Sequence, residues 1–280
     1  MIVIALCVLA AAAYGTSDFT AGLASRRATA GLVTASQELV TLPLTALAVV
    51  VFHGHGPNAS ALAWGAVSGV GTAVGTLSLY HGLSVARMST VATLSAVLAA
   101  AIPLVIGVLL GDHLTLGSGF GIALAVPAIA LISWEPEAQV RRAARAGLLY
   151  GSLAGLGFAL LFVALDRAGT RAGAWPLVPD QLVALFLFLP FASRGLTGFR
   201  RPSRSTLMLT CCAGGLGAIG NLLFLAATGR GELAIIAVVS SLYPAATVVL
   251  ARTFLAEHWT RTQATGLLTS LAAIVLVSLR

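Results

Sequence analysis

The chain has 280 residues, of which 58% are hydrophobic and 9% are charged, and its net charge is +7 at pH 7. A soluble domain carries about 25% charged residues, so a chain this apolar could not cover its surface in water, which excludes soluble, disordered and disulfide-scaffold proteins. Its excess of arginine would suggest a nucleic-acid partner in a soluble protein. Here it indicates loops that face an anionic membrane surface, and we expect an integral membrane protein with no nucleic-acid partner.

Ten apolar segments are predicted as membrane-spanning helices, because a span needs about 20 mostly apolar residues. In chain order they are 2–24, 30–52, 62–85, 89–110, 116–134, 147–166, 178–193, 207–228, 233–255 and 262–279. The first has the small apolar residues of a secretory signal, but no positive charge precedes it, and we interpret it as the first span. The connections are short, so the lipid bilayer is the expected surrounding of this all-α, multi-pass protein.

An internal repeat appears when the chain is shifted by 145 residues. The matched positions include Gly69 with Gly214, Gly75 with Gly220, Ser95 with Ser240, and the sequence G-D-H-L-T at 111–115 with A-E-H-W-T at 256–260. Each copy holds five segments, an odd number, so the second copy enters from the opposite side of the membrane, as in many secondary transporters. We predict a first five-helix repeat at 1–134, a connecting loop at 135–146, and an inverted second repeat at 147–280.

The matched motif places an acid and a histidine at equivalent helix ends, Asp112 with His113 and Glu257 with His258. One interpretation is that each carboxylate caps the next helix and stabilises the positive end of its dipole. The other is a gate latch, in which each acid binds an arginine in one transport state. We favour capping.

No catalytic or metal-binding motif survives inspection, and we expect no metal site, no cofactor and no enzyme activity. The sequence G-L-G-A-I-G at 215–220 matches a dinucleotide fingerprint, but it lies inside an apolar segment, where small residues favour helix packing. The cysteines lie in apolar stretches without metal-ligand spacing, and a solvated turn explains His53 and His55 better than a metal site.

A polar stripe on the second segment predicts a central site. Its residues recur every three or four positions and would be costly against lipid, so they should face the bundle interior or a cavity. Other segments add polar residues, and Pro244 should bend the ninth helix beside them. The candidates are Tyr14, Ser17, Asp18, Thr34, Gln37, Glu38, Thr41, Tyr80, His81, Asn221, Ser240, Ser241 and Tyr243. The alternative is that these residues only form hydrogen bonds between helices and bind no ligand.

Glu38 is the candidate for proton coupling or for contact with a substrate amine. It lies about 5 Å from the middle of its helix at a rise of 1.5 Å per residue. A carboxylate at that depth is costly to leave ionised and unpaired, so we expect it to take up and release a proton. The alternative is a structural ion pair with an arginine such as Arg252 or Arg87.

These features together resemble a known family. Ten segments, a five-plus-five duplication and the acid-basic-hydrophobic-Thr motif are similar to the EamA-type carriers of the drug/metabolite transporter superfamily. The second copy, with S-S-L-Y-P-A-A-T at 240–247 and L-A-E-H-W-T at 255–260, fits the pattern closely. The first copy has Ala99 in place of the proline and Asp112 in place of glutamate. The resemblance implies a secondary carrier, often an exporter, that works by alternating access and in some members is coupled to protons.

We therefore expect a carrier in the cytoplasmic (inner) membrane that moves a small organic solute, such as an amino acid or related metabolite, outward. A passive pore is the main alternative, and an intramembrane enzyme is a weaker one. Eleven arginines follow odd-numbered segments and four lie on the other side, so the positive-inside rule predicts that the odd-numbered side is cytoplasmic. The family resemblance implies the reverse, with both termini in the cytoplasm, and we favour the arginine count.

Overall fold

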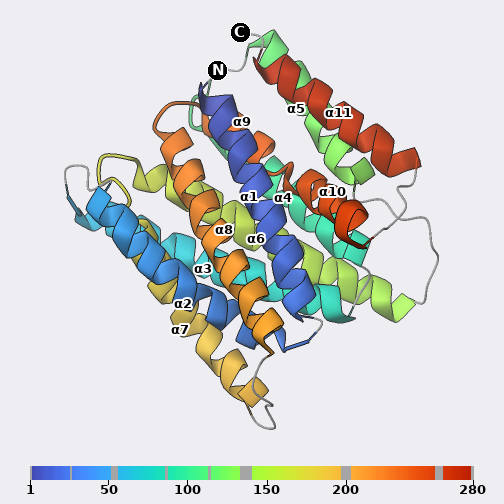
Figure 1. The fold of residues 1–280 in the computed structure, drawn as a ribbon. Helices are drawn as coiled ribbons and strands as arrows, with labels where there is room; N and C mark the ends of the chain where they lie inside the picture. Colours follow the sequence, from blue (N-terminus) through green and yellow to red (C-terminus); the bar gives the residue numbers. More distant parts are fainter. Residues whose placement is uncertain are drawn as a thin grey trace.

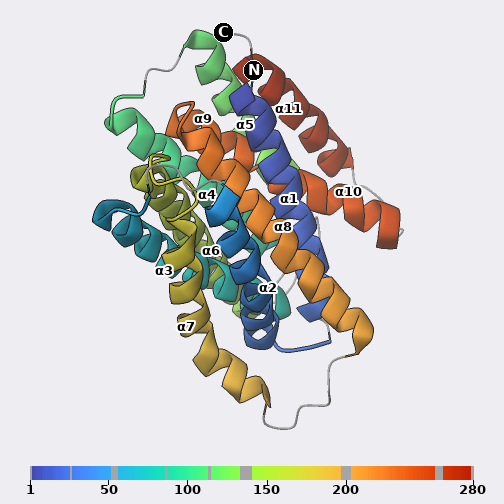
Figure 2. The same cartoon turned by 60° about the vertical axis from the view of Figure 1, so that its left-hand side comes forward.

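The computed structural model describes residues 2–25, 27–51, 56–85, 88–112, 115–132, 141–196, 203–255 and 261–278. Within these ranges every regular element is an α-helix, and the helices pack side by side as one bundle (Figures 1 and 2). In chain order they are α1 (Ile2–Ser25), α2 (Ala30–Val51), α3 (Ala59–Val85), α4 (Met88–Leu109), α5 (Leu116–Ile132), α6 (Arg141–Ala168), α7 (Leu177–Leu196), α8 (Arg204–Thr228), α9 (Leu233–Ser240), α10 (Tyr243–Leu255) and α11 (Arg261–Ser278).

The outer surface of this bundle is apolar. Helices α1, α2, α3, α6 and α8 are long and apolar enough to cross a membrane, and the remaining apolar helices are shorter. Large apolar side chains point outward, including Leu39, which is 64% exposed, and Phe186, which is 69% exposed. A soluble monomer rarely leaves so much apolar surface in water, so this surface is suited to lipid.

Side-chain caps define two helix starts. Asn58 Oδ1 accepts a hydrogen bond from Ala61 N at 2.9 Å where α3 begins, and Ser203 Oγ accepts one from Thr206 N at 3.2 Å where α8 begins. Such caps satisfy backbone donors that have no partner inside the helix. They start α3 and α8, the helices with the matched glycines.

The largest differences from the predicted helices are at the start of α6 and within the predicted ninth helix. Helix α6 begins at Arg141, inside the segment 135–146 that the sequence analysis assigns to a connecting loop. The sequence R-R-A-A-R-A consists of strong helix formers, so the helix extends beyond its apolar part. The predicted continuous helix 233–255 is instead two helices, because α9 ends at Ser240 and α10 begins at Tyr243.

Pro244 gives the physical reason for the break between α9 and α10. A proline has no backbone N–H, and its ring clashes with the carbonyl four residues earlier, which is that of Ser240. The chain makes a tight turn instead, with Leu242 N donating to Val239 O at 3.2 Å and Ala245 N donating to Leu242 O at 3.0 Å. The predicted bend is therefore a full interruption of the helix.

Glycines let neighbouring helices approach closely. The main packed neighbours are α3 with α6, α1 with α8, α5 with α11, α4 with α6, and α2 with α7. Where α3 crosses α6, Gly157 lies directly against Gly71 and Gly75. The core is filled by aromatic side chains between α6 and α8, where Phe162 stacks on Phe224 with ring centres 4.4 Å apart. This packing holds the polar faces of α1, α2, α3 and α8 in the interior.

Candidate functional site

Helices α1 and α8 are joined by two hydrogen bonds from predicted site residues. Tyr14 Oη donates to Asn221 Oδ1 at 2.8 Å, and Ser17 Oγ donates to the Ala213 carbonyl at 2.8 Å. Gly220 lies against the Tyr14 ring and leaves the space that the ring occupies. The structure therefore brings Tyr14 and Ser17 of α1 together with Asn221 of α8, although about 200 residues of chain separate the two helices.

Asp18 and Tyr80 meet between α1 and α3. Tyr80 Oη donates to Asp18 Oδ1 at 3.4 Å, and the Tyr80 side chain is buried while Asp18 is half-buried. His81, one residue further along α3, points elsewhere. Its ring is exposed and meets Tyr150 edge to face at a centroid distance of 4.8 Å. The structure thus places Tyr80 with the interior residues and His81 outside them.

The polar stripe of α2 faces the protein interior, as Thr34, Gln37, Glu38, Thr41 and Thr45 are all buried. Two of its threonines contact other helices. Thr41 Oγ1 donates to the Gly214 carbonyl of α8 at 3.1 Å, and Thr45 Oγ1 accepts a hydrogen bond from Gln181 Nε2 of α7 at 2.6 Å.

Two further threonine contacts of this stripe stay within α2. Thr34 Oγ1 donates to the Gly31 carbonyl at 3.1 Å, and Thr41 Oγ1 also lies 2.9 Å from the Gln37 carbonyl.

Glu38 differs from the threonines of the stripe because one oxygen of its carboxyl group is buried without a hydrogen-bond partner among the described residues. Its side chain is 8% exposed, and the oxygen without a partner is Oε2. The predicted alternative, an ion pair of Glu38 with Arg252 or Arg87, is not tested, since Arg87 and the side chain of Arg252 lie outside the part of the chain that the structure describes.

The break between α9 and α10 places polar groups in the core. Ser240 and Ser241 are fully buried, and Ser241 Oγ has no hydrogen-bond partner among the described residues. Tyr243 Oη lies 3.3 Å from Ser95 Oγ of α4, and Thr247 Oγ1 donates to the Gly15 carbonyl of α1 at 2.9 Å. The interrupted helix is therefore tied to α1 and α4 by polar contacts.

Asp112 caps a helix, but not the helix that follows it in the chain. Its Oδ2 atom accepts a hydrogen bond from Ala234 N at 2.9 Å, at the start of α9. Glu232, the residue at the N-cap position of α9, makes no side-chain cap bond. Gly111, whose φ of 107° only glycine adopts readily, turns the chain just before Asp112. The carboxylate thus links the end of α4 to α9. His113, Glu257 and His258 lie outside the described residues.

A polar group on α7 was missed by the sequence analysis. Asp180 is 0% exposed, and its Oδ1 atom accepts from Ser68 Oγ at 2.7 Å and from Thr72 Oγ1 at 3.0 Å. The available signal was an acid inside an apolar segment. Asp180 lies near the start of that segment, where acids commonly act as caps, and the 145-residue shift places it on Ala35, so neither its position nor the repeat indicates an interior site.

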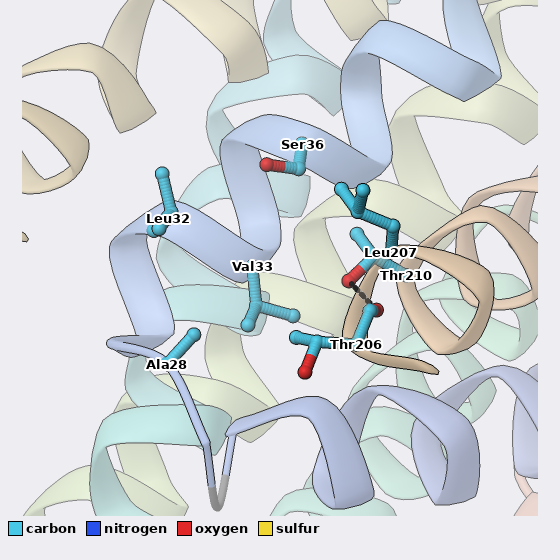
Figure 3. Close-up of a pocket in the computed structure, with 7 residues that line it drawn as sticks. All are labelled: Ala28, Leu32, Val33, Ser36, Thr206, Leu207 and Thr210. Carbon is cyan, nitrogen blue, oxygen red and sulfur yellow. Dashed lines mark hydrogen bonds between the residues drawn. The ribbon is translucent and has the colours of Figure 1, made fainter. Parts of the chain in front are cut away.

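A small pocket opens between the first turns of α2 and α8 (Figure 3). Its volume is about 70 Å³, which is room for a few water molecules. The lining residues are Ala28, Leu32, Val33, Ser36, Thr206, Leu207 and Thr210. Thr210 Oγ1 bonds to the Thr206 carbonyl at 2.9 Å within α8. This pocket contains no residue from the predicted site.

Comparison with known proteins gives two positive findings. Residues 145–279 match the model of the EamA-like transporter family. One solved crystal structure aligns with 99% of this chain and 98% of its own, with a TM-score of 0.76 and 15% sequence identity. At that identity the likeness shows a shared fold and nothing about substrate. No curated protein matches the chain.

Proposed function

Since this chain belongs, through residues 145–279, to the EamA-like transporter family of the drug/metabolite transporter superfamily, we propose that it is a secondary active carrier that exports a small organic metabolite. Amino acids and related compounds are the substrate class that we favour. We propose transport by alternating access, without catalysis and with protons as candidate coupling ions.

The observation that carries this proposal is the set of polar contacts between helices far apart in the chain. Tyr14 bonds to Asn221, Ser17 to Ala213, and Thr41 to Gly214, so α1 and α2 bind α8 through polar groups inside an apolar protein. Polar residues inside a membrane bundle are costly and therefore usually functional. We propose that the predicted residues on α1, α2, α3, α8, α9 and α10, other than the exposed His81, surround the substrate, with Glu38 as the proton-coupling group.

The packing of the helices supports two inverted repeats, 1–134 and 147–280. The repeat pairs α1 with α6, α3 with α8, and α4 with the broken helix α9–α10. Under this correspondence the contact of α1 with α8 becomes the contact of α6 with α3, and both are among the main packed neighbours. The contact of α4 with α6 becomes that of α9 and α10 with α1, which is also present.

The matched glycines show the same correspondence in detail. Gly75 lies against the ring of Phe158 on α6, and Gly220 lies against the ring of Tyr14 on α1. Gly69 similarly lies against a backbone carbonyl of α7, and Gly214 against a backbone carbonyl of α2. Each glycine of one half thus contacts a helix of the other half, and the two helices contacted at matched positions correspond to each other in the repeat. A two-fold axis between the halves would require this arrangement. We infer ten spans related by such an axis.

The connections sort into two sides of the bundle. Arg27 follows α1 and donates a hydrogen bond of 2.8 Å from its guanidinium to Ser205 Oγ, which lies at the start of α8. Thr170, after α6, lies against Gly229, after α8. Because eleven arginines of the sequence, Arg27 among them, follow odd-numbered predicted spans, we propose that the side of Arg27 is cytoplasmic in the inner membrane.

Counterflow in proteoliposomes tests the function. Vesicles containing the purified protein are loaded with an unlabelled candidate amino acid and diluted into a trace of the labelled compound. We expect the label to accumulate transiently, because a carrier exchanges one molecule for another. Protein-free vesicles are the control.

Two other results would overturn the proposal. A pore would let the label equilibrate without transient accumulation, and an enzyme would change the compound chemically. A metabolite screen of cells that overproduce the protein supplies the candidates, and a carrier should lower the amount of its substrate inside the cells.

A further inference from the structure

Asp180 on α7 is a buried acid to which the proposed function assigns no role. Its side chain is fully buried and reaches α3, where Oδ1 lies 2.7 Å from Ser68 Oγ and 3.0 Å from Thr72 Oγ1. Its second oxygen, Oδ2, is also buried and has no hydrogen-bond partner among the described residues.

Capping does not explain this acid. An acid in the first turn of a helix normally accepts hydrogen bonds from backbone N–H groups of that helix. The hydrogen bonds of Asp180 go to side chains of α3 instead. No arginine within the described ranges pairs with it either, so an ionised Asp180 would be a buried charge without a counter-charge, which is strongly unfavourable.

The two oxygens of Asp180 have different surroundings. Oδ1 accepts hydrogen bonds from Ser68 Oγ at 2.7 Å and from Thr72 Oγ1 at 3.0 Å, and Ser68 Oγ also lies 2.7 Å from the Gly65 carbonyl of its own helix. Oδ2 is buried and has no hydrogen-bond partner among the described residues. A neutral acid fits this arrangement, with Oδ1 as the carbonyl oxygen that accepts from both hydroxyls and the proton on Oδ2.

We propose that Asp180 is a proton-binding site, protonated on Oδ2 at neutral pH and held in place by the hydrogen bonds that Oδ1 accepts from Ser68 and Thr72. Helix α7 packs against α2 and α3. The titratable groups on those two helices are Glu38 on α2 and Tyr80 and His81 on α3. No positive charge on either helix favours the ionised form. The inference rests on the proposed function in one respect: it gives the carrier a buried acid on the second half as well as Glu38 on the first.

Infrared difference spectroscopy of the purified full-length protein tests the proposal without any transport assay. A protonated carboxylic acid has a carbonyl stretching band that an ionised one lacks, and burial makes that band slow to shift in D₂O. We expect such a band at neutral pH. Asp180→Asn should remove the intensity of one carboxylic acid. Ser68→Ala should move the band to higher frequency, because the carbonyl oxygen Oδ1 loses one of the two hydrogen bonds that it accepts.

Two acids elsewhere in the chain serve as controls. Asp112 lies at the end of α4, where it accepts a hydrogen bond from Ala234 N and contacts neither Ser68 nor Thr72, so Asp112→Asn should leave the Asp180 component in place. Glu38→Gln should leave the Asp180 component in place.

Three results would overturn the proposal: no such band at neutral pH, a band unchanged in Asp180→Asn, or a band that only Glu38→Gln removes. Failure of counterflow would instead overturn the proposed function and leave the infrared result standing.

Discussion

At the scale of single residues, the acids of this protein differ in what surrounds them. Asp112 receives a backbone N–H at a helix start, Asp18 receives the hydroxyl of Tyr80, and Asp180 receives two hydroxyls. Glu38 is buried with an unpartnered oxygen among the described residues. The same chemical group can therefore stabilise a helix end in one place and bind a proton in another.

The first prediction concerns Glu38 and proton coupling. Glu38→Gln keeps the size and the polar atoms of the side chain but cannot titrate. We expect the variant to exchange solute in counterflow while its transport no longer responds to an imposed proton gradient. Asp166→Asn, which changes a partly exposed acid on α6, is the matched control and should keep the response. An unaltered gradient response in Glu38→Gln would remove Glu38 from the coupling mechanism.

The second prediction concerns the cap between α4 and α9. Asp112→Ala removes the acceptor for Ala234 N and should cost about 1 kcal/mol, as N-cap losses typically do. Thermal unfolding in detergent should shift down by about 2–4 °C. Glu232→Ala is the control, because Glu232 occupies the N-cap position without making a cap bond. Equal losses in both variants would contradict the assignment.

Polar stripes were the part of the site that sequence could predict. The spacing of Thr34, Gln37, Glu38 and Thr41 placed them on one face of a helix, and all four are buried. Spacing along one helix does not indicate a partner on another, so the contact of Thr41 with α8 and that of Asp180 with α3 could not be predicted.

At the scale of elements, glycines decide how closely the helices pack. A Cβ atom added to Gly220 would lie 2.6 Å from Tyr14 Cε1, a distance that real Cβ atoms do not show. A Cβ atom added to Gly215, in the same helix, would find its nearest neighbour, Leu44 Cδ1, at 3.8 Å. One helix thus offers both a tight and an open glycine.

The third prediction uses this difference. Alanine at an open helical glycine gains about 0.5–1 kcal/mol, whereas overpacking costs about 1–3 kcal/mol. Gly215→Ala should therefore be neutral or stabilising, and Gly220→Ala should lower the unfolding temperature. Gly75→Ala, at the matched position of the first repeat, should behave like Gly220→Ala because it meets the Phe158 ring. If both α8 variants unfold at the same temperature, the close approach of α1 and α8 is wrong.

Helix ends were harder to predict than helices. The apolar run 233–255 reads as one helix, and Pro244 indicated only a bend. The structure interrupts the helix at Ser241 and Leu242, just before Pro244, and the second part begins at Tyr243, whose hydroxyl lies 3.3 Å from Ser95 Oγ of α4.

At the scale of the whole molecule, the positions of the two chain ends bear on the number of spans. Helix α1 begins and α11 ends at the same end of the bundle in both views (Figures 1 and 2). This arrangement agrees with an even number of spans. At the other end of α1, Arg27 donates a hydrogen bond to Ser205 Oγ, at the start of α8.

The fourth prediction is that both termini lie outside the cytoplasm. A reporter enzyme that is active only outside the cytoplasm should be active when fused after Arg280. The same reporter fused after Ser203, in an arginine-rich connection, should be inactive, and a reporter active only in the cytoplasm should give the reverse pattern. Cytoplasmic activity after Arg280 would reverse the assignment and favour the orientation that the family resemblance implies.

The sequence by itself predicted a multi-pass helical membrane protein, and residues 145–279 match the EamA-like transporter family model. Composition and segment length decide which stretches are stable in lipid, and these are properties of the chain alone. Only the tertiary structure decided that Asp112 caps α9, that α9 and α10 are separate helices, and that Asp180 meets Ser68 and Thr72. Hydrogen bonds act over about 3 Å, so their partners are set by which helices pack together and not by distance along the chain.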